Sequence, residues 1–574
     1  MATTISVSKK SVREFLATGK ENPFVIPEYQ RPYAWEEEQI EILFDDLKEF
    51  SSNFKESESN PTQYFLGCIV TFNNSKGQQE IIDGQQRITS LFLLLRAIYA
   101  KLDSDPSSPL GLKRAIIESI WRTNLSEDNV NYSDILLSSS VINNTGNEIL
   151  KDILSTGRSD PNNNDNYSKN YRKFQELLNN FSQDSTANFR DFVSHVLERA
   201  IVLPISADSQ DTALRIFSTL NDRGMPLSDA DIFKANIYSN IDNNSRSEFI
   251  QVWQELSDRA TYVSEKVQHL FYYYMFYLRA CDGIFSTTTP GLRKYYSDNN
   301  FQKLLTPNLI DNLTIITNLW QVVNRHESID LENWSKDKGI CQSLDILNSY
   351  PNEFWKYPVI IYYLTHRGKD DFNDSFARFL KKLILELTTK YVITPTINAV
   401  KTNILKLNVG IIKSQYPKFE FMGLSDDNIN HFEKNIICPH PKILRLVLKI
   451  LAYQEQDSLL PEKWEIEHIF PLNSKSAYFN KYTKNKIEDI GNKLPFEKRL
   501  NIRASNKYFE DKKVEYSESK ISIAKKMSER NDITVWDDSC ISRRDNEIIE
   551  TLLNIFKTWD AQYMEKYQEP KSNN

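Results

Sequence analysis

A short polar stretch separates two apolar runs, residues 64–72 before it and residues 91–95 after it. It consists of one carboxylate, one glycine, two amides and one guanidinium: Asp83, Gly84, Gln85, Gln86 and Arg87. Such a run is costly to bury, because buried polar groups need hydrogen-bond partners. The pattern predicts a hairpin of residues 64–72 and 80–82 that leads into a helix over residues 85–102. The stretch is then a strand-to-helix turn, where free backbone N–H groups favour an anion.

The residue types of this turn suit a site for a polar, anionic ligand. Gly84 allows a tight backbone and close approach of the ligand. Arg87 offers a planar fork for phosphate oxygens, and Asp83 can hold a metal ion or position a water molecule. The alternative is a polar turn that only caps a helix beginning near Gln85.

A second amide–guanidinium pair, Gln30 and Arg31, lies on a proline-containing loop before an amphipathic helix predicted over residues 36–50. An alternative role for the arginine is stacking on a nearby aromatic ring. Further along, Asn221 lies in a turn between two predicted helices. We expect this residue to complete the polar pocket, with an ordinary helix corner as the alternative.

The charge of the 574-residue chain is unevenly spread. Formal net charge is −7, which does not favour indiscriminate binding of the whole surface to nucleic acid. Residues 481–530, however, contain 14 Lys and Arg against 8 Asp and Glu, a local charge of +6. A basic segment on an acidic body is compatible with local phosphate contact, although a solvated helix face has the same composition.

Composition is ordinary for a globular chain of two to four domains, with 40% hydrophobic and 26% charged residues. No run approaches the ~20 apolar residues of a membrane span, and the first ten residues lack the apolar core of a signal peptide. The five cysteines are scattered and form no CxxC pair, which argues against a disulfide framework and a cysteine zinc site. These features predict a cytoplasmic protein with no membrane partner.

The middle of the chain, from residue 233 to about residue 454, reads as mostly helical and rich in aromatic residues, with no fixed-period repeat. Aromatic stripes of this kind are more often core than ligand site. The histidines of this region lack companions at metal-ligand spacing. We therefore interpret it as a helical body or spacer.

The clearest chemistry comes late in the chain, where Glu467 directly precedes His468 on a short predicted strand. The pair Gly491-Asn492 follows, and then a further asparagine, Asn501. This order resembles the His-Me finger (HNH) nucleases, in which a ββα unit carries one histidine, a structural asparagine and a final histidine or asparagine. The nine-residue gap from Asn492 to Asn501 suits such a unit. The alternative is a lone histidine in a strand.

Each of these residues has a role in that chemistry. His468 can take a proton from water attacking phosphorus, and Asn492 would tie the loop that aims it. Glu467 and Asn501 would hold one divalent cation, usually Mg²⁺. Lys507 or Lys512 would neutralise charge developing on the phosphate. Two departures from the nuclease pattern are the absence of a third histidine and Glu467 where Asp is common.

Taken together, the motifs resemble the GmrSD-type modification-dependent (type IV) restriction endonucleases, which have an N-terminal DGQQR domain and a C-terminal HNH-like domain. Four ordered stretches carry the resemblance: residues 26–35, 83–87, 217–231 and 467–494. It implies a ParB/sulfiredoxin-like N-terminal domain that binds and hydrolyses a nucleoside triphosphate (NTP). The corresponding cofactor-binding residues are Gln30, Arg31, Asp83, Gly84, Gln85, Gln86, Arg87 and Asn221. No Walker A motif is present.

The expected fold is α+β and mostly helical, in three parts. Residues 1–240 would form the ParB/sulfiredoxin-like domain, residues 241–455 the helical spacer and residues 456–574 the ββα-metal nuclease domain. The expected function is an NTP-regulated, Mg²⁺-dependent DNA endonuclease that restricts phage DNA, modified DNA in particular. A non-catalytic nucleic-acid sensor and a toxin-like RNase are the alternatives. The sequence leaves open which modification, which NTP and whether the chain forms a homo-oligomer.

Overall fold

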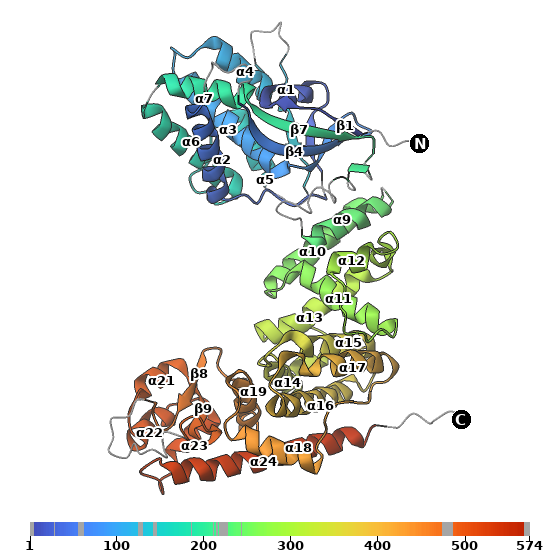
Figure 1. The fold of residues 1–574 in the computed structure, drawn as a ribbon, viewed down its shortest axis with the longest axis vertical. Coiled ribbons are helices and arrows are strands. Elements are labelled where there is room, and N and C mark those ends of the chain that lie inside the picture. Colours follow the sequence, from blue (N-terminus) through green and yellow to red (C-terminus); the bar gives the residue numbers. More distant parts are fainter. Residues whose placement is uncertain are drawn as a thin grey trace, which may run out of the picture. The chain divides into compact units, whose positions relative to one another are not determined.

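The computed structural model describes residues 5–27, 29–54, 62–123, 130–141, 146–184, 186–209, 212–213, 216, 228–242, 244–472 and 486–567. The chain forms two compact units, Met1–Glu255 and Leu256–Asn574. Both are drawn in Figure 1. The described structure is α+β and mostly helical, as predicted. The three-part division by domain type stays a prediction.

The first unit is built on a seven-stranded mixed sheet (Figure 1). Its strands are β1 (Ile5–Val7), β2 (Lys10–Ser11), β3 (Phe24–Ile26), β4 (Tyr64–Asn73), β5 (Gln79–Asp83), β6 (Leu137–Ser139) and β7 (Ala200–Ala207). The main order is β1-β7-β4-β5-β3-β6, with β2 also on β7. Strands β4 and β5 form the predicted antiparallel hairpin, whereas β4 and β7 run parallel. The hairpin therefore lies in the interior of the sheet, with β5 ending at Asp83.

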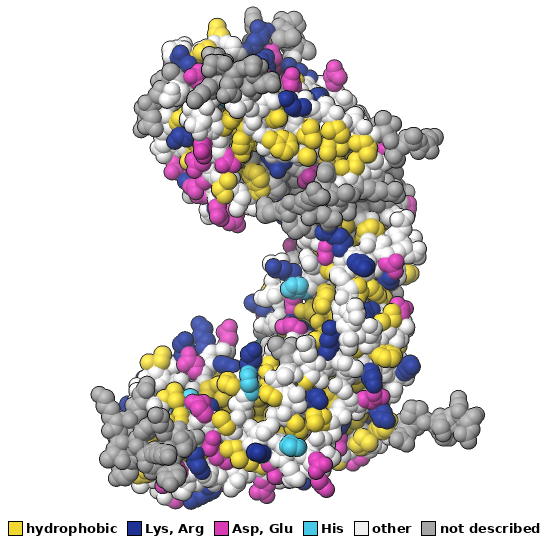
Figure 2. All heavy atoms as spheres, viewed as in Figure 1, with side chains coloured by type: hydrophobic (Ala, Val, Ile, Leu, Met, Phe, Trp, Pro, Cys, Tyr) yellow, Lys and Arg dark blue, Asp and Glu magenta, His cyan; other side chains and the backbone are white. Residues whose placement is uncertain are grey.

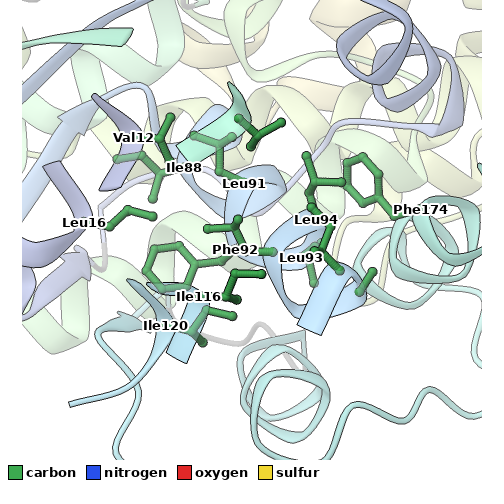
Figure 3. Close-up of a cluster of buried hydrophobic side chains, with 14 of the residues drawn as sticks. Val12, Leu16, Ile88, Leu91, Phe92, Leu93, Leu94, Ile116, Ile120 and Phe174 are labelled. Atoms are coloured by element: carbon green, nitrogen blue, oxygen red, sulfur yellow. The ribbon is translucent and has the colours of Figure 1, made fainter. Parts of the chain in front are cut away.

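The sheet is covered on both faces. Adjacent residues Ile81 and Ile82 belong to different apolar clusters, because successive side chains of a strand point to opposite faces. The larger cluster packs α3 (Gln85–Ser104) against the sheet and against the surrounding helices, as Figure 3 shows for Leu91, Leu94 and Phe174. Since α3 is buried almost all round, its first turn is held rigidly at the end of β5.

The helices of the first unit surround this core. They are α1 (Val12–Ala17), η1 (Thr18–Lys20), α2 (Glu37–Ser52), α3 (Gln85–Ser104), α4 (Leu110–Ile120), α5 (Gly146–Thr156), α6 (Asn166–Asp184), α7 (Thr186–Glu198), α9 (Asp229–Asn240) and the start of α10 (Arg246–Tyr262). The predicted helices over residues 36–50 and 85–102 correspond to α2 and α3, which confirms both.

The second unit begins as a helical body, as the sequence predicted for this region. Its elements are α11 (Val267–Cys281), α12 (Leu292–Ser297), η3 (Gln302–Leu305), α13 (Leu309–Trp320), η4 (Gln321–Arg325), η5 (Asn333–Lys336), α14 (Lys338–Leu347), η6 (Glu353–Trp355), α15 (Lys356–His366), α16 (Phe372–Ile393), η7 (Ile397–Val400), α17 (Lys401–Lys413), α18 (Asp426–Ile436) and α19 (Pro441–Ala452). Aromatic rings of this body pack on one another, as in the stacked pair Tyr362 and Phe379. These aromatics are core, as expected.

A small sheet follows the helical body within the same unit. Its elements are β8 (Trp464–His468), η8 (Ile490–Asn492), β9 (Lys493–Glu497), α21 (Lys498–Ala504), α22 (Phe509–Ser517), α23 (Ser522–Ser528) and α24 (Asp538–Met564). Strands β8 and β9 pair antiparallel, with His468 opposite Lys493. The order strand, strand, helix is therefore present in β8, β9 and α21.

The last helix, α24, connects the small sheet to the helical body. Near its start Asp545 Oδ1 accepts from the Gly491 N–H at 2.7 Å. Near its end Asp560 pairs with Lys382 of α16 at 2.6 Å, and the Tyr563 hydroxyl donates to the Pro417 carbonyl at 2.8 Å. The predicted boundary near residue 455 consequently lies inside one compact unit.

Two further expectations concern the chain as a whole. All five cysteines are free thiols, in agreement with the absence of a disulfide framework. Within the described ranges, no helix combines the length and the hydropathy that a membrane span requires.

Candidate functional site

The polar turn predicted from residues 83–87 joins β5 to α3. Gly84 immediately precedes the helix with φ of +87°, in the left-handed region. A Cβ there would approach Ile69 Cγ1 to 3.1 Å and the Cys68 carbonyl to 3.3 Å. Both the backbone angle and the close neighbours call for glycine, so the strand turns into the helix within one residue.

The glutamine side chains hold the loop of residues 30–35 against this turn. Gln86 Oε1 accepts from the backbone N–H groups of Ala34 (2.7 Å) and Trp35 (3.2 Å). The same amide donates through Nε2 to the Pro32 carbonyl at 3.2 Å. Gln85 Nε2 donates to the Arg31 carbonyl at 3.3 Å. Both side chains are buried, and their contacts are with the protein backbone.

Gln30 closes the arrangement from the loop side. Its Nε2 donates to the Ile82 carbonyl at 3.0 Å, and the side chain is buried. The loop therefore donates a hydrogen bond to the end of β5, and the glutamines of the turn donate hydrogen bonds to the loop. The structure brings Gln30, Gln85 and Gln86 together, with their amides bonded to backbone groups; their part in a nucleotide site stays a prediction.

Three charged residues stand at the edge of this framework. Arg31 is exposed. Arg87 NH1 donates to the Cys68 carbonyl at 3.2 Å and lies against Gly67, where a Cβ would meet the guanidinium at 2.9 Å. Burial raises the pKa of Asp83, while the Gly84 N–H and the positive charge of Arg87 oppose that shift. Arg31 of the loop and Arg87 of the turn are therefore the groups best suited to contact an anion. Asn221 lies outside the described residues.

The second candidate site is the β8–β9–α21 unit, in which Asn492 is fully buried. Asn492 Oδ1 accepts from the Phe470 N–H at 2.7 Å, and its Nδ2 donates to the carbonyls of Phe470 and Ile487 at 3.0 Å each. The Ile469 N–H donates to the Asn492 carbonyl at 2.9 Å. These bonds fix the backbone immediately after His468, which is the geometry a positioning residue requires.

His468 lies at the end of β8 with its side chain 20% exposed. Its Nε2 is enclosed and has no hydrogen-bond partner among the described residues; Glu488 Oε1 lies 3.6 Å away. Burial and the nearby ammonium groups of Lys493 and Lys512 lower the pKa of His468, while Glu488 opposes the shift. A lowered pKa favours the neutral imidazole, the form that can accept a proton.

Glu467 points into a buried pocket that already contains a positive charge. Its Oε1 accepts from Lys512 Nζ at 2.6 Å and from the Tyr516 hydroxyl at 3.0 Å. Lys512 has 0% side-chain exposure and also donates to the His468 carbonyl at 2.6 Å. Burial raises the pKa of Glu467 and lowers that of Lys512, and the contact between the two opposes both shifts. Lys512 thus fixes both residues of the Glu-His pair.

The other predicted site residues lie on α21 and just beyond it. The Asn501 amide donates to Glu465 Oε2 at 3.3 Å, two residues before Glu467 on β8. Lys507 pairs with Glu515 of α22 at 3.0 Å. Asn501 therefore lies beside a carboxylate of β8. Lys512 contacts β8, the strand of His468, whereas Lys507 pairs with α22.

These donors fit Mg²⁺ in kind, because Mg²⁺ prefers carboxylate and amide oxygens and keeps several of its waters. Glu465, Glu467 and Asn501 supply such oxygens from β8 and α21. Among the described residues, no three His, Cys, Asp or Glu side chains gather in a metal-binding arrangement. A divalent ion here would accordingly depend on one or two carboxylates, water and phosphate.

Helix α24 supports the loop before β9. The fully enclosed guanidinium of Arg544 donates through NH1 to the carbonyls of Gly491 and Lys493 at 2.8 Å each. A Cβ on Gly491 would come within 2.7 Å of Asp545 Oδ1. Glycine is therefore required at residue 491 because α24 passes so close. This explains the Gly-Asn pair in the motif.

Four supporting residues escaped the sequence analysis: Glu465, Tyr516, Arg544 and Asp545. A tyrosine four residues after Lys512 on a helix was the one local signal available, because residues i and i+4 share a helix face. The partners of Arg544 and Asp545 lie more than fifty residues earlier in the chain, so no local pattern marks them.

One face of the molecule shows no single broad basic patch among the described residues (Figure 2). On the face shown in Figure 2, Lys and Arg side chains are interspersed with Asp and Glu side chains. This agrees with the overall negative charge. Contact with phosphate would therefore depend on local groups such as those around His468.

Comparison with known proteins places both candidate sites in matched regions. The family model described as GmrSD restriction endonuclease, N-terminal domain, matches residues 12–238. The model described as GmrSD restriction endonucleases, C-terminal domain, matches residues 425–551. An uncharacterised protein of Methanocaldococcus jannaschii is 25% identical over 261 residues, which cover 41% of this chain and 42% of the archaeal protein. The match thus spans less than half the length of that relative.

Proposed function

The chain belongs to the GmrSD restriction endonuclease family, and from this premise we propose that it is a metal-dependent, NTP-regulated DNA endonuclease acting on modified phage DNA. The observation that carries the proposal is the Glu467-His468 pair at the end of β8, held by Asn492 and Lys512. A strand, strand, helix order with Asn501 on the helix supports a His-Me finger nuclease. The membership itself supports a restriction nuclease role.

The proposed reaction is hydrolysis of a phosphodiester bond. His468, whose lowered pKa favours the neutral imidazole, accepts a proton from the attacking water. Asn492 and Lys512 keep the imidazole aimed by fixing the Phe470 N–H and the His468 carbonyl. Lys507, in the exposed connection between α21 and α22, attracts the phosphate electrostatically. Bound through Glu467 and Asn501 together with Glu465, Mg²⁺ would stabilise negative charge on the phosphate oxygens.

The N-terminal turn is the proposed nucleotide site. Arg31 and Arg87 would contact phosphate oxygens, and the N-terminus of α3 would add backbone N–H groups. Gln30, Gln85 and Gln86 would act by holding the loop that presents Arg31, because their amides bond backbone groups. Support for an anion site comes from two arginines beside the start of a helix. A ParB/sulfiredoxin-like identity for this unit remains part of the proposal.

The nuclease assignment is tested with purified full-length chain on modified and unmodified phage DNA, with Mg²⁺ and with or without each NTP. His468→Ala is expected to reduce cutting by at least about 100-fold, since general-base catalysis contributes roughly 10²–10⁴ in rate. His431→Ala, at an exposed position of α18, is the matched control and should cut normally. Equal cutting by His468→Ala and wild type would overturn the assignment.

The nucleotide site is tested separately by binding. Arg87→Ala is expected to weaken NTP binding by about 10- to 150-fold, the equivalent of a charge-assisted hydrogen bond of about 1.5–3 kcal/mol. Arg114→Ala, an exposed arginine of α4, is the control. If Arg87→Ala leaves both NTP binding and phage restriction unchanged, the proposal that a nucleotide at this turn controls the enzyme is wrong.

One observation favours an alternative, a non-catalytic nucleic-acid sensor. The ammonium of Lys512 is already paired with Glu467, the carboxylate proposed to hold the metal ion. A sensor would bind DNA without cutting it under any of the conditions above, whereas an endonuclease nicks plasmid in a Mg²⁺-dependent manner. RNA substrates in the same assay distinguish a toxin-like RNase.

A further inference from the structure

The loop that carries Arg31 is also held by a buried asparagine of α6, Asn170, a residue outside every motif described above. Asn170 is fully buried and lies 135 residues after Trp35 in the chain. Its Nδ2 donates to the Trp35 carbonyl at 2.7 Å and to the Tyr33 hydroxyl at 3.0 Å. Because a carbonyl oxygen can only accept, the atom of Asn170 that faces Trp35 is the amide nitrogen. Both of these hydrogen bonds go to the loop.

The Tyr33 hydroxyl continues these contacts into the first turns of α3. It lies 2.7 Å from Ser90 Oγ, and Ser90 Oγ donates to the Gln86 carbonyl at 2.9 Å. A hydroxyl has one hydrogen to donate, so Tyr33 is the donor to Ser90, and Asn170 is the donor to Tyr33. Burial raises the pKa of Tyr33, so the hydroxyl keeps the proton that it donates. The chain of hydrogen bonds therefore ends at a glutamine of the polar turn.

Both ends of the loop are fixed by these contacts, whereas the side chain of Arg31 between them is exposed. At one end, Gln85 Nε2 donates to the Arg31 carbonyl at 3.3 Å. At the other end, the Trp35 N–H donates to Gln86 Oε1 at 3.2 Å, and the Trp35 carbonyl accepts from Asn170. The path of the loop between these points decides where the guanidinium of Arg31 is presented.

Helix α6 is a firm support for this loop, because it packs directly on α3. Phe174, one turn after Asn170, lies in the apolar cluster beside Leu94 of α3 (Figure 3), and residues i and i+4 share a helix face. The Tyr33 ring also stacks on Tyr167 of α6, with ring centres 4.9 Å apart and ring planes inclined by 29°. The loop is therefore held by α6 through one ring contact and two hydrogen bonds.

We propose that Asn170 is a positioning residue of the nucleotide site, which sets the loop so that Arg31 meets the phosphate oxygens of a bound NTP. Ordering a flexible loop on binding costs affinity, and a loop that is already in its bound form avoids that cost. Asn170 acts through Arg31 and does not touch the nucleotide. Without the hydrogen bonds from Asn170 through Tyr33 to Ser90, Arg31 is present but misplaced. This inference rests on the proposed nucleotide site.

The test measures nucleotide binding to variants of the full-length chain. The probes are the hydrolysis-resistant β,γ-imido analogues of ATP, GTP, CTP and UTP, each titrated in Mg²⁺ by calorimetry. Tyr33→Phe keeps the stacked ring and removes only the hydroxyl, so it should raise the Kd of the tightest analogue about 2- to 12-fold. Asn170→Ala should raise the Kd further, up to the level of Arg31→Ala, which is about 10- to 150-fold above wild type.

Tyr171→Phe is the matched control. Tyr171 follows Asn170 in α6 and is fully buried, and its hydroxyl donates to the Gly157 carbonyl at 3.0 Å instead of to the loop. Both Phe variants lose one buried hydroxyl and should lose similar thermal stability, but only Tyr33→Phe should lose nucleotide affinity. The same Kd in the two variants, whether both are unchanged or both are weakened, overturns the positioning role.

A double-mutant cycle shows whether the effect passes through Arg31. In the Arg31→Ala background, Tyr33→Phe and Asn170→Ala should change the Kd no further, because the group that they position is gone. The same fold-change with and without Arg31 overturns the inference and leaves Asn170 with a packing role alone.

The outcome is separable from that of the proposed function. If wild type binds an analogue and Arg31→Ala weakens that binding, but Tyr33→Phe and Asn170→Ala bind like wild type, the inference fails and the nucleotide site stands. If wild type binds none of the four analogues, both fail.

Discussion

At the scale of single residues, the candidate nuclease site depends on a buried ion pair. Lys512 is the positive group on the Glu467 carboxylate, and it also bonds the His468 backbone. Buried charges tolerate the loss of a partner poorly, because the remaining charge is left uncompensated. The Glu467–Lys512 ion pair therefore holds the Glu-His motif in place only while both of its residues are present.

Replacing Lys512 with methionine should destabilise the second unit by about 3–5 kcal/mol, measured as the free energy of unfolding in urea. Lys507→Met is the control, since Lys507 is partly exposed and surface pairs contribute about 0–1 kcal/mol. The double variant Glu467→Gln/Lys512→Met should recover most of the loss. Equal effects of Lys512→Met and Lys507→Met would contradict this role.

A second residue-scale prediction concerns pH. Burial and the neighbouring carboxylate of Asp545 raise the pKa of Asp489 to about 6, above its ordinary value of about 3.9. Between these values the folded state binds more protons than the unfolded state. The free energy of unfolding must therefore fall as pH rises through this window.

Asp489→Asn cannot ionise, so it should be more stable than wild type at pH 7 and lose that advantage near pH 4. Thermal unfolding across this pH range measures the difference, with the exposed Asp511→Asn as control. A stability difference that does not change with pH would show that ionisation of Asp489 carries no cost.

At the scale of elements, the sequence predicted those parts that local periodicity determines. The hairpin β4–β5 and the helices α2 and α3 follow from alternating or helical apolar patterns. The hydrogen-bond partners of the polar motif did not follow. Gln30 and Gln85 bond carbonyls that lie 52 and 54 residues away in the chain, so only the folded sheet shows that these amides hold a loop.

The same limit applies to the candidate nuclease site. The sequence order predicted β8 and the presence of Asn492 and Asn501 near it. It did not predict that Lys512, 45 residues after Glu467, would form an ion pair with the Glu467 carboxylate. Nor did it show that Asn501 would lie beside Glu465. Long-range pairing decides both contacts.

The turn between β5 and α3 offers an element-scale prediction. Gly84→Ala should destabilise the first unit by more than about 1 kcal/mol, since its φ is positive and its Cβ would touch Ile69. Gly283→Ala is a matched control, because Gly283 also has positive φ but nothing lies within 4 Å of its Cβ. Thermal unfolding of both variants separates the cost of backbone strain from the cost of the contact with Ile69. Equal losses of stability in the two variants would mean that the contact is relieved without cost.

At the scale of the whole molecule, each compact unit has its own buried apolar residues. Units of this kind unfold as separate cooperative transitions. Scanning calorimetry should therefore resolve two transitions, of which Gly84→Ala lowers one. Lys382→Met, which removes the ion pairs to Glu386 and Asp560, should lower the other. A single transition shifted by both variants would contradict two independent units.

Helix α24 also bears on how such a chain can be rearranged by recombination. A gene split just before β8 would separate α24 from α16 and leave the apolar side chains of Leu552, Phe556 and Tyr563 without their packing partners. The β8–β9 hairpin is consequently not a separable unit. A fusion or fission that keeps it folded must carry the helical body in the same polypeptide, so the helical body is inherited together with the candidate site residues.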